Sequence, residues 1–125
     1  MAQKIFITGG TGYIGSLLVE KLLSLGNILH LLYLHEEELE TIPKHENLHF
    51  FKGNILNIES LKNALIDCQK VYHLAGYAKN YAPHDKIFYD INFQGTLNLL
   101  KAASFHPQIQ KILITSSIVT FGPTH

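Results

Sequence analysis

Strand-like apolar runs alternate with helical patterns along the chain, and this alternation limits the possible folds more than any other feature of the sequence. Short β-branched and aromatic runs predict five strands, at residues 4–8, 28–34, 47–53, 70–76 and 111–117. Apolar residues at helical spacing predict helices, at residues 13–26, 58–68 and 85–104. We therefore predict an α/β fold with a doubly wound parallel sheet, helices on both faces, strand order 3-2-1-4-5, and ligands at the carboxyl ends of the strands.

Glycines fill the connection between the first strand and the first helix, where Thr8 to Gly15 reads TGGTGYIG. Gly9 and Gly12 allow the backbone to approach a pyrophosphate group, and Gly15 allows the helix to pack closely on the strand. The start of the helix adds N–H groups and a positive potential that favour phosphate. Because these glycines stand between a strand and a helix, they predict a dinucleotide site rather than an empty glycine-rich turn.

The composition is typical of a compact domain and argues against several classes of partner. Hydrophobic residues make up 46% of the 125 residues and charged residues 16%, which is enough apolar material for a core. Ten basic residues balance ten acidic ones, so we expect no nucleic-acid partner. The apolar run at the N-terminus is too short for a signal peptide, and no run is long enough to span a membrane. We therefore expect a cytoplasmic protein without membrane contact.

The cysteine and histidine content gives no reason to expect a metal site. Cys68 is the only cysteine, so an internal disulfide is excluded and no zinc framework is indicated; we expect a small buried thiol. The eight histidines lack the spacing of metal ligands. For His73, near the end of the fourth predicted strand, we expect a side chain held by the backbone rather than a catalytic group.

Five motifs follow one another along the chain: TGGTGYIG, then GNIL after the third strand, HLAG after the fourth, NFQGTLNLL in the next helix and ITSSIVTFG after the fifth. Each later motif is weak alone. In this order they resemble the extended short-chain dehydrogenase/reductases, the NAD-dependent epimerase/dehydratase group. The resemblance covers essentially the whole chain. It implies a Rossmann-like fold, binding of NAD or NADP, and movement of a hydride at a hydroxyl or keto carbon of a small-molecule substrate.

The resemblance also implies which residues contact the cofactor. The glycine-rich turn would hold the pyrophosphate, and Leu74, Ala75 and Gly76 would form a small apolar wall beside the ribose. The family usually has an acid where this chain has Asn54, whose amide oxygen can still accept a hydrogen bond from the adenine amino group. The implied cofactor contacts are Gly9, Thr11, Gly12, Tyr13, Ile14, Gly15, Asn54, Ile55, Leu74, Ala75, Gly76, Asn92 and Thr115.

The catalytic residues of the family are only partly present. Ser117 matches the family's catalytic serine or threonine, which hydrogen-bonds the substrate oxygen, and Ser116 is the alternative. The family's Tyr-x-x-x-Lys pair, which supplies the proton donor, is absent, because no tyrosine here is followed by lysine four residues later. We therefore interpret residues 1–125 as an incomplete dinucleotide-binding domain, truncated after the fifth strand, without its substrate lobe. The family implies a possible homodimer for the full-length form.

The function that these features favour is the NAD(P)-binding part of an oxidoreductase or epimerase. It resembles the dihydroflavonol reductases slightly more than the sugar-nucleotide epimerases, and alone we expect it to bind cofactor without turnover. The alternatives are a non-catalytic module that senses a dinucleotide or binds a partner, and a general α/β interaction domain with an empty glycine turn. Glutamates at 36–38 disfavour a 2′-phosphate and so favour NAD over NADP, although His35 and Lys44 could offset this.

Overall fold

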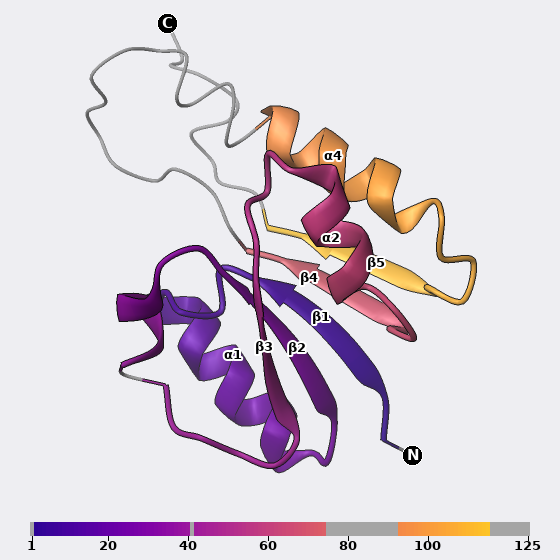
Figure 1. Ribbon diagram of the computed structural model, residues 1–125. Helices are drawn as coiled ribbons and strands as arrows, with labels where there is room; N and C mark the ends of the chain where they lie inside the picture. The colour runs from indigo at the N-terminus through magenta and orange to yellow at the C-terminus, as the bar shows by residue number, and fades with distance from the viewer. Residues whose placement is uncertain (1, 41, 75–92, 116–125) are drawn as a thin grey trace, which may run out of the picture.

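The five strands form one parallel sheet in the order β3-β2-β1-β4-β5, which confirms the predicted topology. The computed structural model describes residues 2–40, 42–74 and 93–115 (Figure 1). Each strand lies within its predicted range. The strands are β1 (Lys4–Thr8), β2 (Ile28–Tyr33), β3 (Leu48–Lys52), β4 (Lys70–His73) and β5 (Lys111–Ile114).

Helix α1 (Tyr13–Ser24) covers one face of the sheet, and α2 (Ile58–Ala64) and α4 (Gly95–Ala103) cover the other (Figure 1). The chain leaves α1 at Gly26, whose φ of 87° suits glycine. Helix α2 is shorter than predicted, and the chain turns at Asp67, which has a φ of 64°. A short 3-10 helix that was not predicted, η1 (Glu36–Leu39), follows β2. Of the helix predicted over 85–104, residues 85–92 lie outside the described residues.

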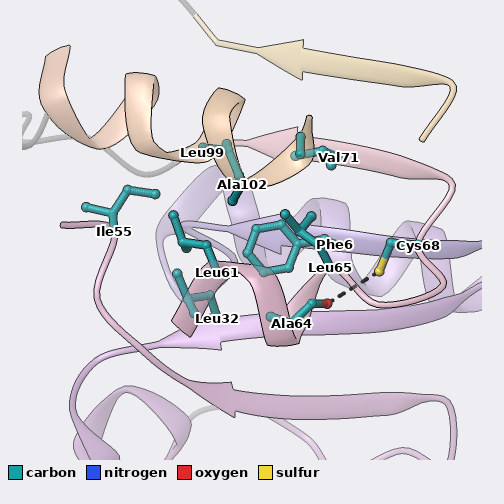
Figure 2. Close-up of a cluster of buried hydrophobic side chains, with 11 residues drawn as sticks. Phe6, Leu32, Ile55, Leu61, Ala64, Leu65, Cys68, Val71, Leu99 and Ala102 are labelled. Atoms are coloured by element: carbon teal, nitrogen blue, oxygen red, sulfur yellow. Dashed lines mark hydrogen bonds between the residues drawn. The ribbon is translucent and has the colours of Figure 1, made fainter. Parts of the chain in front are cut away.

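Two hydrophobic clusters pack against the two faces of the sheet, and β1 contributes to both. Ile5 and Ile7 belong to the cluster under α1, whereas Phe6 belongs to the cluster under α2 and α4, as the two-residue period of a strand requires. Figure 2 shows the second cluster, with Phe6 among side chains from α2, α4 and β4. Because β1 is buried on both faces at the centre of the sheet, its carboxyl end is a rigid starting point for the turn that follows.

A histidine and the lone cysteine are buried on the α2 side of the sheet. His30 Nδ1 lies 2.7 Å from the carbonyl oxygen of Ala64, which can only accept, so this nitrogen carries the proton. Cys68 Sγ lies 3.5 Å from the same oxygen (Figure 2). Burial raises the pKa of the Cys68 thiol to about 12, so the thiol stays protonated and unreactive at neutral pH. The predicted buried thiol is thus confirmed.

Candidate functional site

The glycine-rich turn after β1 is built from close approaches between its own backbone atoms. Gly9 has a φ of 74°, which glycine adopts without strain, and its carbonyl oxygen accepts a hydrogen bond from the Gly12 N–H at 3.2 Å. A Cβ added at Gly15 would overlap the Gly9 carbonyl oxygen and would come within 2.8 Å of the Gly10 Cα. The first turn of α1 therefore rests directly on the backbone of the turn, and this contact leaves no room for a side chain at position 15.

The space around Gly12 is open, in contrast to the space around Gly15. The nearest neighbour of a Cβ at Gly12 would be the Gly9 carbonyl oxygen, at 3.4 Å. Gly12 is the N-cap of α1 and offers no side-chain cap, and the next two residues, Tyr13 and Ile14, are 85% and 71% exposed. The first N–H groups of a helix have no partner within the helix. They and the positive end of the helix dipole are thus available to an anion beside Gly12.

Two residues complete this turn. Thr11, a predicted cofactor contact, is half-buried and lies between Gly9 and the N-cap. Gly10 was not among the predicted site residues, yet a Cβ there would overlap the side chain of Leu31 on β2. From the sequence, a role was predicted for the first of the two adjacent glycines in TGGTG and none for the second. The structure shows that the second of them, Gly10, packs directly against the side chain of Leu31 in the core under α1.

The carboxyl ends of β1, β4 and β5 meet beside the turn. The N–H of Leu74 donates to the Thr8 carbonyl at 3.0 Å, and the N–H of Thr115 donates to the His73 carbonyl at 3.2 Å. Leu74 is half-buried and Thr115 is exposed. The structure therefore brings these two predicted cofactor contacts to the sheet edge that also carries Gly9.

The side chain of His73 is held by hydroxyl groups, whereas the sequence analysis had expected the backbone. Its Nδ1 lies 2.6 Å from Thr8 Oγ1 at the end of β1, and its Nε2 lies 3.0 Å from Thr96 Oγ1 in the first turn of α4. Burial lowers the pKa of His73, so the ring is neutral at pH 7. The expectation was wrong because both partners are distant in sequence, and no local pattern brings them to the histidine.

Asn54, predicted to contact adenine, follows β3, and its side-chain oxygen already accepts a hydrogen bond from the Leu56 N–H at 2.9 Å. A carbonyl oxygen has two lone pairs, so one acceptor position remains. The side chain of Ile55 is 8% exposed and lies in the core, where a Cβ on Gly95 would come within 2.9 Å of it. Only the backbone of Ile55 can therefore face a ligand. Asn98 of α4, which was not predicted, donates to the Ile55 carbonyl at 3.2 Å.

The end of β2 is organised by glutamates of η1. Glu38 Oε2 accepts hydrogen bonds from the N–H groups of Leu34, at 2.7 Å, and His35, at 2.8 Å. Glu36 lies 3.6 Å from Lys52 Nζ at the end of the neighbouring strand β3, and both side chains are well exposed. The sequence had drawn attention to the charge of these glutamates. Only the structure shows that one of them, Glu38, accepts hydrogen bonds from the backbone N–H groups after β2.

Four predicted site residues, Ser117, Ala75, Gly76 and Asn92, lie outside the described residues, so their roles stay predictions. Within ranges 2–40, 42–74 and 93–115, no group of three or more histidine, cysteine or acidic side chains could hold a metal ion. No helix in the same ranges is long and apolar enough to cross a bilayer.

Comparison with known proteins finds relatives that are longer than this chain. A putative dihydroflavonol 4-reductase of Synechocystis is 30% identical over 125 residues, which cover 98% of this chain and 35% of that protein. The mouse sterol-4-alpha-carboxylate 3-dehydrogenase, decarboxylating, is 29% identical over 116 residues, which cover 93% of this chain and 30% of that protein. This chain thus spans about a third of the length of each relative.

A solved structure and a family model agree with these relatives. The crystal structure of the Bordetella bronchiseptica enzyme WbmH in complex with NAD+ superposes with a TM-score of 0.82 and 26% identity, covering 98% of this chain and 41% of that one. The model of the NAD dependent epimerase/dehydratase family matches residues 5–125. With the five-stranded parallel sheet and the glycine-rich turn after β1, the match over nearly the whole chain shows that this protein belongs to the NAD dependent epimerase/dehydratase family.

Proposed function

We propose that this chain is the NAD-binding part of an oxidoreductase or epimerase that moves a hydride to or from a hydroxyl- or keto-bearing carbon of a small molecule. Family membership supports an enzyme of this kind, and the two relatives described above are named as a reductase and a dehydrogenase. The observation that carries the proposal is the turn from Gly9 to Gly15, at the carboxyl edge of the central strand.

The residues of the turn fit a pyrophosphate. A phosphate needs donors that it can approach closely. The uncapped first turn of α1 supplies backbone N–H groups just after Gly12, which has no side chain to block the approach, whereas the Gly12 N–H itself donates to the Gly9 carbonyl. Gly15 fixes the helix against the turn, so the donors are held in place before any ligand arrives. In this proposal Asn54 offers its remaining lone pair to the adenine amino group, Leu74 lies beside the ribose, and Thr115 contacts the cofactor from the end of β5.

The chemical step needs more than binding. NAD, when bound, supplies the hydride acceptor or donor. The hydroxyl of Ser117 is proposed to hydrogen-bond the substrate oxygen, but a serine hydroxyl alone does not exchange the required proton near neutral pH. The sequence of 125 residues contains no Tyr-x-x-x-Lys pair. We therefore propose that these residues bind NAD and a substrate oxygen without turnover of their own.

The arrangement after β2 supports a preference for NAD over NADP. A 2′-phosphate would need free donors or cations at the end of β2, where the ribose of a dinucleotide lies in this fold. Glu38 already occupies the two backbone donors there, and Glu36 pairs with the nearby Lys52. A 2′-phosphate would therefore meet carboxylates instead of donors, and like charges repel.

Isothermal titration of the 125-residue chain with NAD+ and with NADP+ tests the proposal. We expect measurable NAD+ binding, weaker NADP+ binding, and no cofactor-dependent turnover of alcohols, ketones or nucleotide sugars. Absence of NAD+ binding to the folded chain would contradict the proposed function. NADP+ binding roughly tenfold tighter than NAD+ binding, a difference of about 1.4 kcal/mol, would overturn only the preference.

A second candidate is a non-catalytic module that senses a dinucleotide, and the lack of a Tyr-x-x-x-Lys pair in these residues favours it. The two candidates share the turn and differ in turnover. An assay of the protein as its gene encodes it separates them. Hydride transfer that Ser117→Ala slows far more than it weakens NAD+ binding supports the enzyme. NAD+ binding with no hydride transfer to any carbonyl substrate supports the module.

A further inference from the structure

His73 connects β4, β1 and α4 at the carboxyl ends of the strands. It is the last residue of β4 and pairs in register with Thr8, the last residue of β1. Its ring lies between two hydroxyl groups, with Nδ1 2.6 Å from Thr8 Oγ1 and Nε2 3.0 Å from Thr96 Oγ1 on α4. Both His73 and Thr8 are buried. A neutral imidazole donates through one nitrogen and accepts through the other, so it can satisfy both hydroxyl groups at once.

Thr8 is the residue on which the turn begins. The next residue is Gly9, whose carbonyl oxygen accepts from Gly12 and touches the position of Gly15. The backbone carbonyl of Thr8 accepts from the Leu74 N–H at 3.0 Å, which ties the main chain of β1 to β4. The hydrogen bond to His73 ties the side chain as well. The orientation of Gly9, and through it the placement of the first N–H groups of α1, therefore depends on the end of β4.

We propose that His73 is a positioning residue for the phosphate-binding turn. It holds Thr8, and hence Gly9, at a fixed position relative to the first turn of α4. The distance between the glycine-rich turn and α4 is therefore constant. This inference rests on the proposed function, because it concerns how the turn holds a dinucleotide. His73 does not touch the cofactor in this account. Its effect on binding passes through Thr8.

The molecule offers a matched control in His30. Its ring is also buried on the α2 side of the sheet, and its Nδ1 donates to the Ala64 carbonyl at 2.7 Å. His30 pairs in register with Phe6, two residues before Thr8, and therefore lies away from the carboxyl edge. Loss of either histidine removes a buried polar ring and a hydrogen bond. Only loss of His73 releases the residue that precedes the turn.

Two conservative variants of His73 separate its two hydrogen bonds. The amide of asparagine reaches the position of Nδ1, and the amide of glutamine reaches the position of Nε2. His73→Asn therefore keeps a partner for Thr8, and His73→Gln keeps a partner for Thr96. If His73 contributes only to general stability, the two variants should have similar NAD+ affinity. If His73 positions the turn, His73→Gln should bind NAD+ more weakly than His73→Asn.

The test measures the NAD+ dissociation constant by calorimetry and the melting temperature of each variant of the 125-residue chain. We expect His73→Gln to weaken NAD+ binding roughly tenfold, the effect of one lost buried hydrogen bond, whereas His73→Asn stays within about threefold of the parent chain. His30→Phe should lower the melting temperature while the dissociation constant stays within about threefold. Equal affinities of the Asn and Gln variants, or an equal loss in His30→Phe, would overturn the inference.

Substitutions at Thr8 give a second route that does not disturb the histidine. Thr8→Val keeps the shape and removes the hydroxyl, whereas Thr8→Ser keeps the hydroxyl. We expect Thr8→Val to weaken NAD+ binding as much as His73→Gln, and Thr8→Ser to restore most of it. The double variant Thr8→Val, His73→Gln should bind NAD+ no more weakly than Thr8→Val alone, because both substitutions remove the hydrogen bond between Thr8 and His73. Additive losses contradict the inference. If the parent chain binds no NAD+, the proposed function fails, and this inference fails with it.

Discussion

The β1–α1 turn and the β2–η1 connection lie at the same edge of the sheet, but they are built by different means. The turn is formed by backbone atoms at distances that exclude side chains, with Gly15 lying on the Gly9 carbonyl. The connection after β2 is formed by side chains, with Glu38 folded back onto the N–H groups of Leu34 and His35. Backbone contacts tolerate few substitutions, and we propose that the first region sets whether a dinucleotide binds. Side-chain contacts are readily replaced, and we propose that the second region sets which dinucleotide binds.

The largest effect is expected from Gly15→Val. The added Cβ would overlap the carbonyl of Gly9, and backbone atoms cannot move aside as the end of a flexible side chain can. We expect the free energy of unfolding to fall by about 3 kcal/mol or more, with loss of NAD+ binding. Urea denaturation followed by circular dichroism measures the change. A variant as stable as the parent chain would show that α1 can shift away from the turn, and that the close packing is not required.

Gly12→Val is expected to separate binding from folding. Its Cβ would meet only the Gly9 carbonyl oxygen, at 3.4 Å, and the φ of −77° at Gly12 is accessible to any residue. The melting temperature should therefore stay within a few degrees of the parent value. The side chain would stand where the backbone is proposed to meet pyrophosphate, so calorimetry should detect no NAD+ binding. A folded Gly12→Val chain with unchanged affinity for NAD+ would place the phosphate site elsewhere.

Glu38→Ala is expected to change the preference between cofactors and not the fold. Removal of the carboxylate frees the N–H groups of Leu34 and His35 and reduces the repulsion of a 2′-phosphate. We expect the ratio of NADP+ to NAD+ affinity to rise about tenfold, as two charge-assisted hydrogen bonds become available.

Glu37→Ala is the matched control for this experiment. Glu37 lies on the same 3-10 helix and its replacement removes the same charge, but Glu38 continues to occupy the two N–H groups. The ratio of affinities should therefore change less in Glu37→Ala than in Glu38→Ala. Equal changes in the two variants would mean that only the net charge of the segment matters, which would contradict the role given to Glu38.

The same difference between the two regions explains what the sequence could predict. The strand order and the place of the glycine-rich turn could be predicted from local patterns, because apolar periodicity and glycine spacing depend only on residues that are close in the sequence. The contact of His73 with Thr8 joins residues 65 positions apart, and the burial of Ile55 against Gly95 depends on how α4 packs. The bonds of Glu38 depend on a side-chain rotamer. Contacts of these kinds have no periodic signal in the sequence.

The smallest expected effect is a dependence of stability on pH that originates in two buried histidines. Burial lowers the pKa of both His73 and His30 below the ordinary value of 6.5. The unfolded chain therefore binds protons at mildly acidic pH that the folded chain does not bind. Stability from these two rings is fully present above pH 6.5 and is lost as the pH falls through their lowered pKa values.

Thermal melts between about pH 7.5 and pH 5 test this dependence. We expect the melting temperature of the parent chain to fall with pH, and the fall to be smaller in His73→Asn, because asparagine keeps a partner for Thr8 but binds no proton. The glycine turn carries no histidine, aspartate or glutamate of its own. A slope that His73→Asn leaves unchanged would therefore show that the support beneath the turn does not titrate either, and that protonation of His73 costs the folded state nothing.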